Sequence, residues 1–174
     1  MFIVITGLDG SGTSTLAKQL SKIDTGSSVF RTPSDDYSQR DLIDKNVREF
    51  SQTAHYLYYL SSVVYISDII RKFYNYKDNN IYCVRYLIDT VVSHQVAGLD
   101  VDMDYSTYNI LEPDLTIFVQ LEESIRNQRI SARGKGVLDK LLDDAERREK
   151  FLEGFKKNLN PEKRCTLTTA IQIL

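Results

Sequence analysis

The N-terminal segment holds residues whose types and spacing suit phosphate binding. Glycines recur at Gly7, Gly10 and Gly12, directly after the apolar run Phe2–Ile5 and before a helical pattern that opens at Thr13. Glycines let successive backbone N–H groups curl around an anion, and the helix N-terminus adds unpaired donors. The segment therefore predicts a site for nucleotide phosphates, formed by Gly7, Leu8, Asp9, Gly10, Ser11, Gly12, Thr13, Ser14 and Thr15. Ser14 stands at the last position of the phosphate-loop pattern G-x-x-x-x-G-K-[ST], whose hydroxyl group binds Mg²⁺.

One position of this loop departs from the pattern G-x-x-x-x-G-K-[ST]. Thr13 occupies the place of the lysine that normally reaches the β- and γ-phosphates. Lys18 lies a full turn beyond Ser14 and should point away from a bound phosphate. Nucleotide binding tolerates the missing lysine better than fast phosphoryl transfer does. The alternative is a glycine turn that joins strand and helix without any ligand.

A second source of positive charge lies in the C-terminal half of the sequence. Arg126, Arg129 and Arg133 are spaced three and four residues apart, so they share one face of a helix. We expect them to supply catalytic charge from a flexible lid at about residues 126–136, where Gly134 and Gly136 permit movement. The alternative is an ordinary solvated basic helix face.

Two further arginines follow predicted buried strands. Arg31 and Arg85 would lie at the carboxyl edge of a parallel sheet, where open α/β sheets bind their ligands. Both suit the phosphate of a molecule that accepts a phosphoryl group. Asp89, one turn after Arg85, is placed to orient the Arg85 side chain. Surface salt bridges are the alternative for both arginines. His94 is more typical of a satisfied, partly buried histidine than of a catalytic base.

The elements that must position these residues alternate between strand and helix. We expect strands at Phe2–Ile5, Ser27–Arg31, Ile81–Val84, Asp114–Leu121 and within Cys165–Leu174. Helical patterns cover Thr13–Lys22, most of Asp41–Tyr74 with a buried later part, Leu87–Ala97 and Val137–Asn158. Thr32–Gln39 and Asp100–Asn109 are the expected flexible loops. This alternation predicts a three-layer α/β sandwich, a parallel five-stranded sheet with helices on both faces.

Length and composition indicate one globular domain, residues 1–174. Apolar residues make up 42% of the 174 residues and charged residues 26%. A net charge of −2 gives no overall attraction to a nucleic acid polymer or an anionic membrane. No apolar run reaches the length of a membrane span, so we expect a cytoplasmic protein. Cys83 and Cys165 lack metal-site spacing and are expected to be free thiols.

Over most of its length the sequence resembles the thymidylate kinase family of P-loop kinases. Seven segments carry the resemblance: Ile5–Gly12, Phe30–Pro33, Arg85-Tyr86, Ser93–Gln95, Pro113–Ile117, Arg126–Gly134 and Glu153–Phe155. Their order and spacing matter more than any one of them. Three positions differ from the family pattern: Thr13 replaces the lysine, Val84 replaces an aspartate, and Leu60-Ser61-Ser62 lacks an arginine that faces the acceptor.

The resemblance implies a nucleoside monophosphate kinase that uses ATP and Mg²⁺, with dTMP as the expected acceptor. It implies that Asp9 holds the sugar and that Arg31, Arg85 and Tyr86 lie at the acceptor. His94 and Gln95 would lie near the base. Catalytic charge would come from Arg85, Arg126, Arg129 and Arg133, and a homodimer would form through the long apolar helix. Two alternatives stay open: a kinase of another nucleotide or nucleoside, and a nucleotide-binding protein that transfers phosphate slowly.

Overall fold

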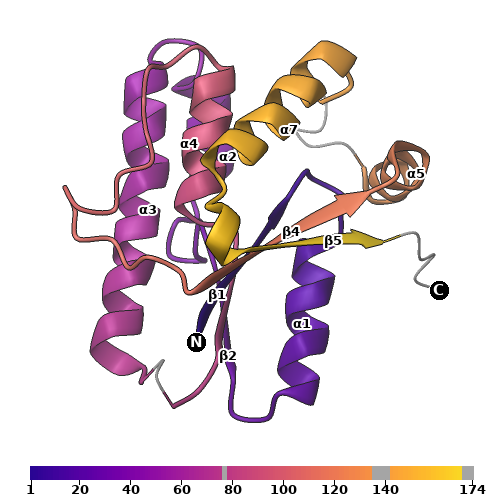
Figure 1. Cartoon of the computed structure of the whole chain (residues 1–174). Helices are drawn as coiled ribbons and strands as arrows, with labels where there is room; N and C mark the ends of the chain where they lie inside the picture. Colours follow the sequence, from indigo (N-terminus) through magenta and orange to yellow (C-terminus); the bar gives the residue numbers. More distant parts are fainter. Residues whose placement is uncertain (76–77, 135–141, 170–174) are drawn as a thin grey trace.

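The computed structural model describes residues 1–75, 78–134 and 142–169. Five parallel strands form one sheet in the order β2-β3-β1-β4-β5 (Figure 1). The strands are β1 (Phe2–Gly7), β2 (Ser28–Arg31), β3 (Ile81–Val84), β4 (Leu115–Leu121) and β5 (Arg164–Thr169). The central strand β1 is buried along its whole length, as expected for a continuous apolar run flanked by parallel neighbours. The predicted parallel five-stranded sheet is confirmed.

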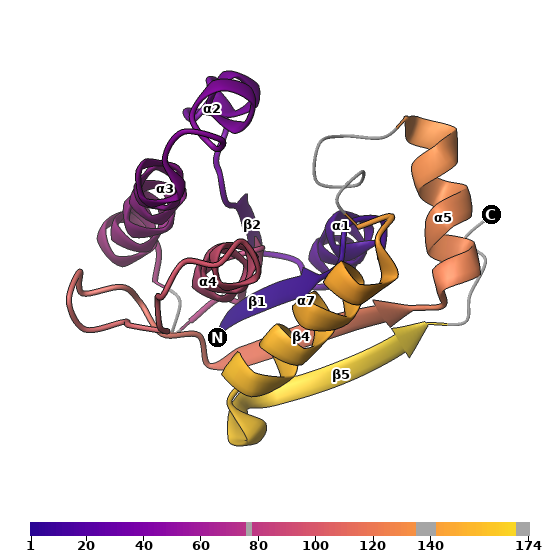
Figure 2. The ribbon, with the colours of Figure 1, turned by 90° about the horizontal axis from the view of Figure 1, so that it is seen from above.

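Helices cover both faces of this sheet, as the strand alternation predicts (Figure 2). Phe2 and Val4 of β1 pack with α3 (Gln52–Phe73) and α4 (Leu87–Val96), whereas Ile3 and Ile5 pack with α1 (Thr13–Ile23). A further cluster joins α4, β4 and α7 (Ala145–Asn158). The described residues also form the helices α2 (Arg40–Asn46) and α5 (Glu123–Arg133) and a short 3₁₀ turn at Pro161–Lys163. The three-layer α/β fold is therefore confirmed.

Two predicted element boundaries need correction. The helix expected over Val137–Asn158 begins at Ala145, because the Asp144 side chain accepts the backbone N–H groups of Glu146 and Arg147 and caps it there. Leu142 is buried outside the helix, and residues 137–141 lie outside the described part of the chain. The strand expected within Cys165–Leu174 spans Arg164–Thr169, and residues 170–174 also lie outside the described part.

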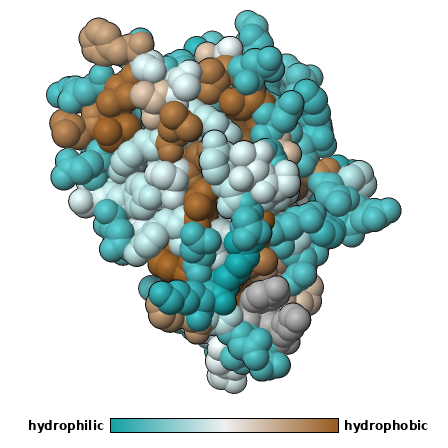
Figure 3. Space-filling model, turned by 90° about the vertical axis from the view of Figure 1, so that its left-hand side faces the viewer, coloured by the Kyte–Doolittle hydropathy of each residue, from teal (hydrophilic) through white to brown (hydrophobic). Residues whose placement is uncertain are grey.

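The long helix α3 is buried on one side only. Ser51 caps its N-terminus, and Leu60, Val63, Ile66 and Ile70 face the core. Leu57 and Tyr65, however, are 50% and 39% exposed. Figure 3 shows the side of the molecule where α3 lies, with several separate apolar areas among hydrophilic groups. The prediction of a buried later part is therefore confirmed for the side that faces the core and wrong for the side with Leu57 and Tyr65, because apolar residues on most sides of a helix do not require a protein layer on each side.

Several other expectations concern the surface and the loops. Thr32–Gln39 and Asp100–Asn109 lie outside the helices and strands. Cys83 and Cys165 are free thiols, the first buried and the second exposed. No helix in the described ranges is both long and apolar enough to span a membrane.

Candidate active site

The loop between β1 and α1 has the geometry of a phosphate cradle. Gly10 and Gly12 adopt φ angles of 86° and 98°, which residues with side chains rarely do. The Ser11 N–H donates to the Leu8 carbonyl at 3.1 Å, so the chain turns tightly before α1 begins at Thr13. The first N–H groups of a helix have no acceptor within it, and here they open toward the loop. A Cβ at Gly7 would stand 2.5 Å from the Val119 carbonyl oxygen, so this position needs glycine.

The residues after Gly12 show what this cradle contains and what it lacks. Thr13 is buried and Ser14 is exposed at the start of α1. Ser14 offers one hydroxyl oxygen, which suits Mg²⁺ because this ion takes most of its ligands from phosphate and water. Lys18 is exposed one turn further along α1 and does not replace the missing lysine in the loop.

Helix α5 packs directly on the phosphate loop. Arg126 is 2% exposed, and its guanidinium donates to the Asp9 carbonyl oxygen at 3.0 Å while pairing with Glu123. A Cβ at Gly10 would lie 2.9 Å from the Ile130 side chain, and one at Gly12 would lie 3.2 Å from the Arg129 Nη1 atom. Arg129 therefore lies at the glycine that ends the loop. Of the predicted lid, Arg133 is the last residue of α5, and residues 135–136 lie outside the described part of the chain.

Arg85 lies on the other side of the loop, at the carboxyl end of β3. Its φ of 64° is a left-handed conformation, unusual for a residue with a side chain and frequent at functional sites. One guanidinium nitrogen donates to Asp89 at 2.9 Å, and the other pairs with Asp9 of the loop. Asp89 also accepts from the Thr6 hydroxyl at 2.7 Å and from the Tyr86 N–H at 3.0 Å. Burial raises the pKa of Asp89, although the Arg85 charge and these hydrogen bonds oppose that effect.

A cavity opens beside the loop and Arg85. It is lined by six groups of residues along the chain: Gly7, Leu8 and Asp9; Thr32 and Pro33; Arg40, Asp44 and Arg48; His55 and Tyr59; Arg85, Asp89, Thr90, Ser93 and His94; Leu142, Phe151 and Phe155. The lining combines three guanidinium groups with aromatic side chains. Such a mixture suits a ligand that carries both an anionic group and a planar ring.

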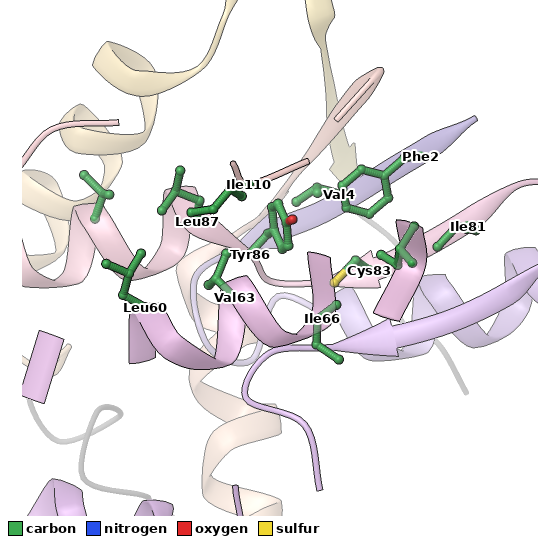
Figure 4. Packing of buried hydrophobic residues seen from close by; sticks show 12 residues of the cluster. Phe2, Val4, Leu60, Val63, Ile66, Ile81, Cys83, Tyr86, Leu87 and Ile110 are labelled. Atoms are coloured by element: carbon green, nitrogen blue, oxygen red, sulfur yellow. The ribbon is translucent and has the colours of Figure 1, made fainter. Parts of the chain in front are cut away.

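The structure brings only some of the predicted acceptor residues to this cavity. Asp9, Arg85 and His94 line it. Tyr86 is instead buried in the core, edge-on to Phe2 with ring centroids 5.2 Å apart (Figure 4). The Gln95 amide is bonded to the Val101 carbonyl and to Asn158. Arg31 is exposed and pairs with Asp35, so its guanidinium lies outside this lining.

Sequence reasoning missed four charged or ionisable residues of the cavity: Arg40, Asp44, Arg48 and His55. They lie on α2, after α2 and on α3, in a stretch whose only clear signal is helical periodicity. Two arginines eight residues apart around an aspartate were the available sign of an anion site. Nothing in their spacing shows that they lie opposite the phosphate loop.

Comparison with known proteins gives the family. A family model for thymidylate kinase matches residues 5–172. The chain belongs to the thymidylate kinase family. The curated proteins contain no match to this chain.

Solved structures of kinases share the fold of this thymidylate kinase family member. Thymidylate kinase from Candida albicans is 19% identical with a TM-score of 0.71, over 96% of this chain and 82% of that one. Thymidylate kinase from Ehrlichia chaffeensis is 21% identical with a TM-score of 0.63, over 100% and 89%. Deoxyadenosine kinase from M. mycoides with bound dATP is 20% identical with a TM-score of 0.69, over 99% and 93%. At these identities the likeness shows the fold alone.

Proposed function

We propose that this protein is a nucleoside monophosphate kinase that transfers the γ-phosphoryl group of ATP, with dTMP as the leading acceptor. The observation that carries the proposal is the placement of cationic groups beside the phosphate loop. Arg129 lies at the end of the phosphate loop, and Arg85 is held beside the loop by Asp9 and Asp89. Phosphoryl transfer requires mainly alignment and positive charge around the moving group.

The donor side of the reaction would use the loop and α5. The N–H groups of the loop and of the α1 N-terminus bind the ATP phosphates, and Ser14 holds Mg²⁺. Mg²⁺ held there would neutralise part of the phosphate charge. Arg129 and Arg133 supply the charge that a lysine at position 13 would have supplied.

The acceptor side favours a substrate that already carries a phosphate. The arginine missing from Leu60-Ser61-Ser62 has two potential substitutes in the cavity, Arg40 and Arg48, besides Arg85. Arg48 has no acidic side chain within 4.0 Å among the described residues, so its charge is available to an anion. Guanidinium groups bind phosphate oxygens strongly, whereas a neutral nucleoside gains nothing from an added cation.

One specific observation supports a second candidate. Thr13 and Val84 replace the lysine and the aspartate of the family pattern, so the protein could bind nucleotide and transfer phosphate slowly. The homodimer expected from the resemblance also stays a proposal, and the exposed Leu57 and Tyr65 on α3 are its natural contact points.

A coupled assay of ADP release tests these functions. ATP and Mg²⁺ are supplied with one acceptor at a time: dTMP, other nucleoside monophosphates, thymidine and deoxyadenosine, the last because a structural relative is a deoxyadenosine kinase. We expect fastest turnover with dTMP, and no more than background ADP release without acceptor. Faster turnover with a nucleoside than with any monophosphate would contradict the proposal. Tight ATP binding with no acceptor-dependent ADP release would favour the second candidate.

A further inference from the structure

A chain of hydrogen bonds runs along the cavity wall formed by α2, α3 and α4. The Asp44 carboxylate lies 2.8 Å from Nε2 of His55, and Nδ1 of His55 lies 2.8 Å from Nε2 of His94. Nδ1 of His94 lies 2.6 Å from the Thr90 carbonyl oxygen. Both imidazole rings are buried. All four ring nitrogens are therefore engaged by the protein, and His94 has none left to bond a nucleotide base.

These contacts fix how many protons the two rings hold. The Thr90 carbonyl only accepts, so Nδ1 of His94 carries a hydrogen, and the Ser93 hydroxyl near it donates to the same carbonyl at 3.0 Å. The Asp44 carboxylate accepts from Nε2 of His55. The contact between the rings needs one more hydrogen, since two lone pairs would repel at 2.8 Å. Three hydrogens on two rings give the pair one positive charge.

The hydrogen bonds place this charge on His55: when His94 donates through Nδ1 and accepts at Nε2, both ring nitrogens of His55 donate. Burial lowers the pKa of His94 to about 4, so this ring stays neutral. Burial would raise the pKa of Asp44, but hydrogen bonds from His55 and Tyr59 and the Arg40 charge lower it overall. The other groups that face the pair are Arg48 beside α2, Tyr56 and Tyr59 on α3, and Arg85, Asp9 and Asp89 across the cavity.

Helix α2 depends on this network because it has little other attachment. It contributes no buried residue to the protein, and Figure 2 shows it at the periphery beside α3. Asp44 accepts from His55 and from the Tyr59 hydroxyl at 2.6 Å, and Arg40 donates to the same hydroxyl at 3.2 Å. Arg40 and Arg48 lie on either side of Asp44 in sequence, and both line the cavity.

We propose that the protonated His55–His94 pair positions α2. It holds this helix in place through Asp44, an arrangement that we call the latch, and so places Arg40 and Arg48 at the acceptor phosphate. This role rests on the proposed function. The proton stabilises the latched state, so the latch is complete where Asp44 is ionised, His94 is neutral and the pair holds its extra proton, and it is lost as the pH rises through the deprotonation of the pair. The Michaelis constant of the acceptor should then rise with pH, while that of ATP stays nearly constant.

Nitrogen NMR of ¹⁵N-histidine-labelled protein tests the proton count without any enzymatic activity. The sequence contains only two histidines, so four ring nitrogens give the whole spectrum. We expect the signature of three protonated nitrogens near neutral pH, decreasing to two at higher pH. One protonated nitrogen per ring throughout the range above pH 6 would overturn the latch.

Kinetics with Asp44→Asn tests the positioning role. The amide removes the negative partner of His55, so we expect about a 10-fold or greater rise in the acceptor's Michaelis constant, a smaller change in kcat, and loss of its pH dependence. Asp44→Glu should restore part of the affinity. Asp41→Asn is the matched control, because Asp41 is exposed on the same helix and should leave all constants unchanged.

Circular dichroism first establishes that each variant is folded. In wild type, the midpoint of the rise in acceptor Michaelis constant should coincide with the midpoint of the NMR titration. An active Asp44→Asn variant with unchanged acceptor affinity and pH profile would overturn the positioning role. Absence of turnover with every acceptor would instead overturn the proposed function, and the NMR result would then decide the proton count by itself.

Discussion

The Arg126 guanidinium donates to the carbonyl oxygen of Asp9 and thereby joins α5 to the phosphate loop. The bond spans 117 positions in the sequence and connects two parts of the site that the sequence shows only as separate motifs. Arg126 is also paired with Glu123, so its charge is already balanced by the protein. The neighbouring Arg129, one turn along α5, approaches Gly12 instead.

The bond to the Asp9 carbonyl predicts that Arg126→Ala mainly lowers stability. The change removes a buried charged donor from the Asp9 carbonyl, so we expect a loss of about 1–3 kcal/mol in the free energy of unfolding, measured by urea denaturation. Gln128→Ala, an exposed position on the same helix, is the control and should change little. Equal stability of the two variants would show that Arg126 does not hold the loop.

Arg129→Ala should affect catalysis instead. Its guanidinium is proposed to stabilise charge in the transition state, so we expect kcat to fall about 100-fold or more with a much smaller change in ATP affinity. Steady-state kinetics and equilibrium ATP binding give the two quantities, again beside Gln128→Ala. Arg133→Ala is expected to behave in the same way. Equal losses in kcat and ATP affinity would count against a transition-state role for either arginine.

Gly10→Ala tests the packing between the loop and α5. Gly10 and Gly98 have φ angles of 86° and 93°, so alanine at either costs about 1–2 kcal/mol of backbone strain. Only at Gly10 does the new Cβ approach the Ile130 and Arg126 side chains, since no atom lies within 4 Å at Gly98. We expect Gly10→Ala to lower both the melting temperature and ATP affinity more than Gly98→Ala does. Identical melting temperatures and affinities would mean that α5 moves aside freely.

Thr13→Lys restores the cation that the loop lacks. If the missing lysine limits phosphoryl transfer, turnover should rise at least about 10-fold, since one well-placed charge on the transferring group is worth more than that. Thr13→Met, of similar length and without charge, is the control for the added side chain. An increase in both variants, or in neither, would show that positive charge at position 13 does not limit the rate.

The two cysteines should differ sharply in reactivity. Burial raises the pKa of the Cys83 thiol, whereas Cys165 is exposed on β5. With a thiol reagent such as DTNB, we expect one rapid equivalent in native protein and a second only after unfolding. Cys165→Ser should abolish the rapid phase. A rapid phase that persists in this variant would mean that β3 opens readily.

Much of the fold follows from the sequence because the apolar runs are unambiguous. Phe2–Ile5 and Ile81–Val84 are short, β-branched and flanked by turns or helices, and both are buried strands. The start of α7 could not be found in this way, because leucines before Ala145 continue the helical spacing although Asp144 caps the helix. A capping side chain acts through one or two hydrogen bonds, which a periodicity cannot show.

The candidate site also has a part that the sequence predicts and a part that it does not. The phosphate loop and Arg85 were predictable, because their positions follow from local motifs and strand ends. For His94 the sequence predicted a satisfied, partly buried ring, and this is confirmed, but it could not show that the partner is His55, 39 positions away. Gln95, adjacent in sequence, turns away from the cavity toward Val101. On a helix, neighbouring residues face different directions, so two adjacent residues that match a family motif need not both face the ligand.

The absence of any buried residue in α2 has a consequence for how this enzyme family can change. Because none of the three apolar clusters includes a residue of α2, most of its sequence can be exchanged without a loss of core packing. The phosphate loop and the sheet stay intact when that happens. If α2 binds the acceptor as proposed, preference for the acceptor can diverge, in evolution or in a laboratory graft of residues 40–48, separately from the core packing of the scaffold.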